Sequence, residues 1–128
     1  MEINFDGNNI TLSSEYVGTA TPWGDKYVKQ HYVVEVSVGD VAFTFDYYCN
    51  DTSLDDTELA NALYCSLSDA MYYADATDID DFAETFGYTK VSECLKAYNG
   101  CKDEYNNWMK TGINIHEFAD YLQTEYNL

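Results

Sequence analysis

The sequence has no arginine, and its six lysines leave one long stretch without positive charge. No lysine occurs between Lys29 and Lys90, whereas thirteen carboxylates fall among residues 30–89. Residues 1–29 and residues 90–128 each carry a net charge of −2, so residues 30–89 supply −13 of the total −17. A field of this sign repels nucleic acids and anionic membranes and attracts basic partners. This charge asymmetry is the main functional clue in the sequence.

Other absences narrow the class of protein. No apolar run is long enough to cross a bilayer, and the opening Met-Glu-Ile-Asn-Phe-Asp does not resemble a signal peptide, so we expect a soluble, cytoplasmic protein without membrane contact. The sequence lacks a nucleophile elbow, a phosphate-binding glycine loop and a His-Glu-x-x-His motif, so we do not expect an enzyme. The four cysteines show no Cys-x-x-Cys spacing, which favours reduced thiols over a disulfide framework.

Metal-binding patterns are incomplete. Residues 51–55 have the first ligand spacing of a calcium-binding EF loop, but Asp56 replaces the required glycine and Ala62 replaces the bidentate glutamate. Neither His31 nor His116 has a cysteine or histidine at ligand spacing. We therefore predict no metal site and no cofactor.

The composition excludes a disordered acidic tail, which would lack aromatic residues. Thirteen tyrosines, six phenylalanines and two tryptophans accompany a hydrophobic content of 46%. A chain of 128 residues is long enough to bury one core. We predict a single domain over residues 1–128, with a sheet in residues 1–50 and helices in residues 51–128.

The first fifty residues have the pattern of strands. Apolar and polar residues alternate between Val41 and Cys49, which is typical of a half-buried strand. Two further strands are predicted over Asn9–Ala20 and Tyr27–Val38, and Gly39-Asp40 provides a tight connection. The three strands indicate an antiparallel meander.

After Asn50 the period becomes helical. Helix starts are predicted at Asp55-x-x-Glu58, Asp78, Val91 and Asn114-x-x-Glu117, and helix ends at Gly87 and Thr111-Gly112. Ile79, Phe82 and Phe86 are predicted to face inward, and Leu95, Tyr98, Tyr105 and Trp108 to share one side of the third helix. The predicted class is α+β, with an N-terminal three-stranded antiparallel sheet followed by about four helices packed on it.

Eleven of the thirteen carboxylates in the lysine-free stretch, those between residues 46 and 84, form the candidate partner-binding set. They are Asp46, Asp51, Asp55, Asp56, Glu58, Asp69, Asp75, Asp78, Asp80, Asp81 and Glu84. Six lie at predicted helix N-termini, where each is stabilising by roughly 0.3–1 kcal/mol. Helix capping explains these acids but not the missing lysines. A lysine three or four residues from an acid is mildly favourable, whereas a like charge at that spacing costs roughly 0.2–0.5 kcal/mol.

The spacing of these carboxylates favours mimicry of a phosphate backbone. Glu58 and Asp69 share one side of a predicted helix, about 16 Å apart along its axis. Duplex DNA carries one charge per ~1.7 Å, so a net charge of −17 equals about eight or nine base pairs. Tyr48 and Tyr72 lie among the acids as candidate interface anchors, a role in which tyrosine is enriched.

Part of the chain resembles a known group of proteins. The similarity lies in Phe43-Thr-Phe-Asp46, Leu59 to Ala76, the run Asp80 to Tyr88, Ala97-Tyr98 and Glu104-Tyr105, and it covers roughly residues 41–126. These segments resemble small acidic proteins of phages and mobile elements of Gram-positive bacteria. The resemblance implies a mobile-element origin, in which such proteins often disarm restriction or CRISPR nucleases.

Charge and resemblance together predict an acidic DNA-mimic inhibitor, of the anti-CRISPR or anti-restriction kind. Its partner would be a basic host protein that normally binds nucleic acid, and it would not bind nucleic acid directly. The alternative is an adaptor module that recruits a host factor through its tyrosine-rich sheet face. A third interpretation, an enzyme, would require a cleft that holds a carboxylate pair.

Overall fold

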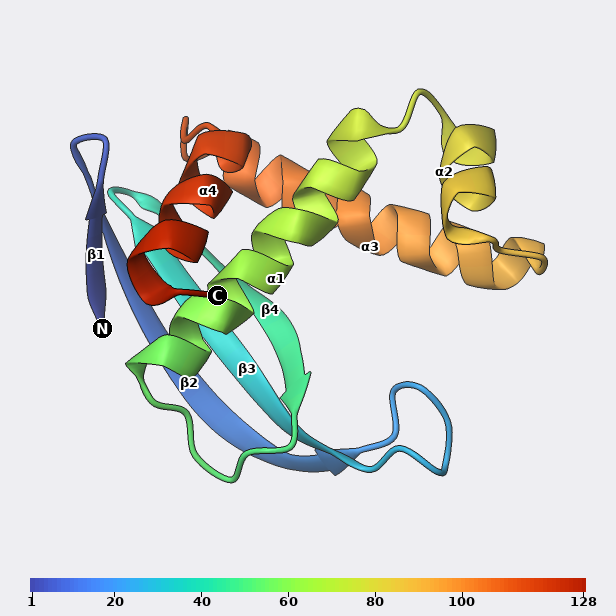
Figure 1. Cartoon of the computed structure of the whole chain (residues 1–128), viewed down its shortest axis with the longest axis horizontal. Helices are drawn as coiled ribbons and strands as arrows, with labels where there is room; N and C mark the ends of the chain where they lie inside the picture. Colours follow the sequence, from blue (N-terminus) through green and yellow to red (C-terminus); the bar gives the residue numbers. More distant parts are fainter. The chain divides into compact units, whose positions relative to one another are not determined.

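The computed structural model describes all residues 1–128 and consists of two compact units, Met1–Leu63 and Tyr64–Leu128. The elements follow in the order β1 (Glu2–Phe5), β2 (Asn8–Ala20), β3 (Lys29–Val38), β4 (Val41–Cys49), α1 (Asp56–Asp75), α2 (Ile79–Phe86), α3 (Val91–Met109) and α4 (Ile115–Tyr126) (Figure 1). The class is α+β, as predicted, with strands first and four helices after them. The predicted number of strands was wrong, because the sheet has four.

The sheet of the first unit is an antiparallel meander in the order β1-β2-β3-β4. Side chains on its central strands alternate between a buried and a more exposed face. In β3 the even-numbered residues from Tyr32 to Val38 are buried, and Phe45 and Tyr47 continue this face on β4. The alternation predicted for Val41 to Cys49 is therefore confirmed.

The strand that the sequence did not predict is β1. It pairs with β2 through a tight turn in which Asp6 and Gly7 both have positive φ, 50° and 78°. Two such residues give the turn geometry that matches the twist of antiparallel strands. Ile3 lies opposite Ile10, and both are buried. A strand of only four residues is too short for its alternation to stand out.

Helix α1 begins against the end of the sheet. The carboxylate of Asp55 caps it by accepting the backbone N–H of Glu58 at 2.8 Å. The Glu58 carboxylate in turn accepts the hydroxyl of Tyr47 at 3.0 Å, and Asn61 donates its side-chain amide to that hydroxyl at 2.9 Å. This network joins the first turns of α1 to strand β4.

The helix ends of the second unit agree with the predicted signals. Asp78 caps α2 by accepting the backbone N–H of Asp81 at 2.8 Å, and Asn114 caps α4 by accepting that of Glu117 at 3.1 Å. Gly87 ends α2 at a φ of 70°, the left-handed conformation that glycine adopts at little cost. These local signals are confirmed because capping depends on neighbours in the sequence.

A buried hydrogen-bond chain joins α3 to α1 within the second unit, where α3 passes behind the C-terminal half of α1 (Figure 1). The indole N–H of Trp108 donates to the hydroxyl of Ser66, and that hydroxyl donates to the carboxylate of Glu104. Trp108 is fully buried, as are Leu67, Phe118 and Leu122 of the same unit. Of the residues predicted to share one side of α3, Trp108 is therefore fully buried.

Two predicted inward residues are exposed. Phe86 is the last residue of α2 and is 42% exposed, because the helix ends at Gly87 before its final turn can be covered. Leu95, in the second turn of α3, is also exposed. None of the four helices combines the length and the apolar character that spanning a membrane demands.

Candidate functional site

The candidate carboxylates of the first unit lie on β4, on the following loop and at the start of α1. Asp46, Asp51, Asp55 and Asp56 are exposed, and Glu58 is half-buried. Oδ1 of Asp46 lies 2.8 Å from Nε2 of His31, on the more exposed face of the sheet. Asp55 and Glu58 make the hydrogen bonds at the start of α1. The carboxylates of Asp51 and Asp56 have no ion pair or hydrogen bond within the chain.

The other six carboxylates lie on the second half of α1, on the loop after it and on α2. Asp69, Asp75, Asp78, Asp80 and Glu84 are exposed, and Asp81 is half-buried. Oδ1 of Asp75 lies 3.2 Å from Nε2 of His116. Oδ2 of Asp81 accepts the backbone N–H of Thr77 at 3.0 Å. The side chains of Asp69, Asp80 and Glu84 have no such partner.

No lysine neutralises any of the eleven carboxylates. The chain has three ion pairs, and two of them join a histidine to Asp46 or Asp75. The only pair with a lysine joins Lys90 to Glu93 at 3.8 Å, outside the candidate set. Lys29 donates to the side chain of Asn50 instead. The absence of positive charge from residues 30–89 is therefore not repaired by lysines from elsewhere in the fold.

The two candidate tyrosines have different surroundings. Tyr48 is half-buried on β4, where its ring stacks on His31 with centroids 4.6 Å apart and meets the edge of Trp23 at 6.0 Å. Tyr72 is 45% exposed on α1, and its ring contacts that of Phe86 at 4.8 Å. The structure therefore places Tyr48 in a cluster on the sheet and Tyr72 beside the acids of the second unit.

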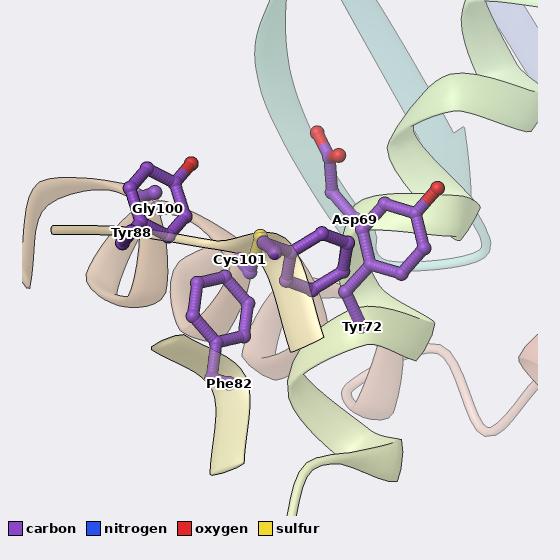
Figure 2. Close-up of a pocket in the computed structure, with 8 residues that line it drawn as sticks. Asp69, Tyr72, Phe82, Tyr88, Gly100 and Cys101 are labelled. Atoms are coloured by element: carbon purple, nitrogen blue, oxygen red, sulfur yellow. The ribbon is translucent and has the colours of Figure 1, made fainter. Parts of the chain in front are cut away.

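Tyr72 borders two hollows in the second unit. The first, of about 290 Å³, is lined by Asp69, Tyr72, Phe82, Phe86, Tyr88, Ala97, Gly100 and Cys101. Figure 2 shows the rings of Tyr72 and Tyr88 on opposite sides of it, with Cys101 between them and the carboxylate of Asp69 beside Tyr72. The second hollow, of about 280 Å³, is lined by Tyr72, Asp75, Ala76, Asp81, Phe82, Thr85 and Phe86. We call these two hollows and their carboxylates the acidic-aromatic surface.

Phe86 and Tyr88 belong to this surface, although the sequence did not single them out as site residues. The pattern of α2 predicts Phe86 as an inward residue, and nothing in the sequence shows that the helix leaves its last ring uncovered. Phe82, one turn earlier, is only 2% exposed. Its ring contacts both exposed rings: its centroid lies 4.9 Å from that of Phe86 and 6.0 Å from that of Tyr88. The Gly87 stop marks Phe86 as the last residue of α2, but it does not reveal whether the ring is covered.

Burial within the first hollow changes the acidity of its polar groups. Desolvation raises the pKa of the Asp69 carboxyl to about 6. Desolvation also raises the pKa of the Tyr88 hydroxyl, and it raises that of the Cys101 thiol to about 12, with the charges of Asp69 and Glu104 adding to the effect. The Asp69 carboxylate therefore has no positive side chain in the first hollow to stabilise its ionised form.

No three or more His, Cys, Asp or Glu side chains come together in an arrangement that could hold a metal ion. None of the four cysteines forms a disulfide; Cys94 is buried and Cys65 is exposed.

Comparisons with protein-family models, with curated proteins and with solved structures gave no match to this chain. The resemblance to small acidic proteins of phages and mobile elements therefore remains a prediction.

Proposed function

We propose that the chain is a stoichiometric inhibitor that occupies the nucleic-acid-binding groove of a basic host protein. The observation that carries this proposal is the set of eleven carboxylates on β4, α1, α2 and their connecting loops that no lysine approaches within ion-pair distance. Ordinary solubility requires a net charge of magnitude about 2 to 8 in a small domain, well below the −17 of this chain.

The energetics of the acids on α2 support this function. Asp80, Asp81 and Glu84 lie within two turns of α2, where like charges at spacings of three or four cost roughly 0.2–0.5 kcal/mol per pair. The folded chain itself does not relieve this repulsion. Lysines and arginines that normally grip phosphates would relieve it, and the unfavourable term would become part of the binding free energy.

The target class follows from the same chemistry. A CRISPR nuclease or a restriction enzyme holds nucleic acid in a positively charged channel, and in Cas9-type enzymes arginines also read the flanking motif of the target. Carboxylates can replace the phosphates or bases that these side chains contact, so the inhibitor competes with nucleic acid and does not bind it. The resemblance described for residues 41–126 points to the same class.

The test is capture from bacterial lysate on the immobilised full-length chain at low salt. The expected outcome is retention of a nucleic-acid-binding protein that is released both by a salt step and by added duplex DNA. Retention that is equal at low and high salt, or that DNA does not displace, would contradict the proposal. The identity of the released protein decides between a CRISPR nuclease and a restriction enzyme.

A second function, an adaptor that binds through the sheet, is favoured by one observation. Trp23 is 60% exposed in the loop between β2 and β3, and its ring meets Tyr48 on one side and the Lys29 ammonium, 5.8 Å from its centroid, on another. An adaptor of this kind would lose its partner in Trp23→Ala and keep it after charge reversal at Asp80 and Glu84. The inhibitor would show the opposite pattern.

A further inference from the structure

The two hollows of the acidic-aromatic surface share one pair of rings. Tyr72 from α1 and Phe86 from α2 line both, and their rings meet edge to face at 4.8 Å. The hollows measure about 290 Å³ and 280 Å³, just below the smallest volumes typical of small-molecule sites, roughly 300 Å³. Spaces of this size suit inserted side chains of a partner better than a free ligand.

Each hollow combines aromatic walls with carboxylates of one sign. Asp69 borders the first, and Asp75 and Asp81 border the second, whereas no lysine or histidine lines either. The rings that form the walls are large apolar groups left accessible, with Tyr72 45% and Phe86 42% exposed. An apolar partner helix would desolvate the Asp69 carboxylate, which has no ion pair or hydrogen bond within the chain, and such burial is costly.

We infer that each hollow receives an arginine side chain of the partner, stacked on the Tyr72–Phe86 ring pair and hydrogen-bonded to the bordering carboxylates. A guanidinium group is flat, weakly hydrated and able to stack on aromatic rings, and it donates to a carboxylate in a two-pronged geometry. A lysine ammonium is compact and strongly hydrated, so it gains less from a partly apolar hollow. The inference rests on the proposed function and names the side chains that the partner contributes.

The composition of the chain excludes one alternative occupant. A second copy of this protein cannot supply the arginines, because the sequence contains none. Its lysines are few, and two copies of net charge −17 repel each other. The charge of the surface and the absence of arginine therefore indicate a partner of different sequence.

The test compares two glycine-rich peptides of equal charge, one with two arginines and one with two lysines, against the full-length protein. Binding is followed by NMR of the aromatic side chains. We expect the arginine peptide to shift the ring resonances of Tyr72 and Phe86 and to bind roughly 3- to 5-fold more tightly than the lysine peptide. Equal affinity for the two peptides, or shifts confined to other rings, would overturn the inference.

Matched variants test which rings and which carboxylate contact the arginine peptide. Phe86→Leu should abolish the preference for arginine, and Phe86→Tyr, which keeps a ring, should retain it. Asp69→Asn should weaken the arginine peptide more than Glu84→Gln, which removes the same charge from α2 but lines neither hollow. A preference that survives Phe86→Leu and Tyr72→Leu would also overturn the inference.

The two proposals fail in different experiments. If DNA does not displace the captured protein, the inhibitor function is wrong whatever the peptides show. If the peptides bind equally while DNA still displaces the captured protein, the carboxylates act as a general acidic surface and the arginine hollows are wrong. Circular dichroism of every variant confirms that the helices are intact.

Discussion

The indole N–H of Trp108 donates a hydrogen bond to the hydroxyl of Ser66 at 3.0 Å, in the buried interior of the second unit. The bond fixes the C-terminal part of α3 to the middle of α1, and Ser66 is only 2% exposed. α1 carries Asp69 and Tyr72 one to two turns further along, and α3 carries Gly100 and Cys101 on the other side of the same hollow. This buried contact therefore joins the two helices, α1 and α3, that line opposite sides of the first hollow.

Replacing Ser66 by alanine should destabilise the protein by about 1–3 kcal/mol, because the buried Trp108 N–H loses its acceptor and Glu104 loses a donor. Urea unfolding followed by tryptophan fluorescence measures the change. Ser68→Ala, two residues along the same helix and half-buried, is the control and should change stability by less than about 0.5 kcal/mol. Equal effects of the two substitutions would show that the hydrogen bond contributes little to the free energy of unfolding.

Asp78 has two separable roles. Its side chain caps α2, and its charge belongs to the candidate set. Asp78→Ala should cost about 1 kcal/mol of stability through loss of the cap, whereas Asp78→Asn keeps an acceptor oxygen and should cost much less. Both variants remove one negative charge and should weaken partner binding alike. If Asp78→Ala weakens partner binding and Asp78→Asn does not, Asp78 has a purely structural role.

Charge reversal on α2 should abolish partner binding without unfolding the chain. The useful pair is Asp80→Lys with Glu84→Lys, because both side chains are exposed and unpaired, whereas Asp81 accepts the backbone N–H of Thr77. We expect a loss of about tenfold or more in affinity, measured by titration of the captured partner at low salt.

The matched control for this reversal lies on α4. Asp120→Lys with Glu125→Lys changes the net charge by the same amount at exposed positions outside the candidate set. If the α4 variant loses as much affinity as the α2 variant, net charge alone drives binding. In that case α2 has no specific part in it.

Local signals in the sequence predicted most of the elements. Caps at Asp55, Asp78 and Asn114 and the stop at Gly87 depend only on nearby residues, so they were confirmed. The first strand was missed because four residues carry too little alternation, and its pairing with β2, which places Ile3 opposite Ile10, is visible only in the structure.

The candidate site was less predictable because its geometry depends on contacts between helices. The sequence shows which residues are acidic, but not that Tyr72 and Phe86 meet as exposed rings between Asp69 and Asp81. Hydrophobic period alone assigns Phe86 to the interior. The stacking of Tyr48 on His31 and its edge contact with Trp23 could not be read from the sequence either, and its role as an interface anchor stays a prediction.

The thiols should differ strongly in reactivity. The pKa of Cys101 is raised to about 12, first by desolvation and then by the charges of Asp69 and Glu104, so almost no thiolate is present at neutral pH. Cys65 is exposed on α1. Alkylation with iodoacetamide at pH 7.5, followed by mass spectrometry of peptides, should modify Cys65 at least about tenfold faster than Cys101. Comparable rates in the native state, with unfolding excluded, would mean that the first hollow is open to solvent.

Asp69 gives the protein a pH dependence of definite sign. Its pKa rises from 3.8 to about 6 on folding, because partial desolvation at the rim of the hollow disfavours the carboxylate. The folded state therefore binds more protons than the unfolded chain between these pH values, and stability falls as pH rises through that window. Tyr88 and Cys101, which share the hollow, stay neutral throughout this pH window, because their ordinary pKa values already lie above it and desolvation raises them further.

The substitution Asp69→Asn isolates this effect. It should stabilise the protein by about 0.5–1 kcal/mol at pH 7.5, a value reduced for solvent screening because the residue is exposed at the rim. The gain should shrink toward zero at pH 4, where the native carboxyl is protonated and resembles the amide. Urea unfolding of both proteins across this range measures the difference, in which contributions of all other groups cancel. A gain that is constant with pH would mean that the side chain changes packing, whereas a loss at pH 7.5 would mean that the carboxylate already has a favourable partner.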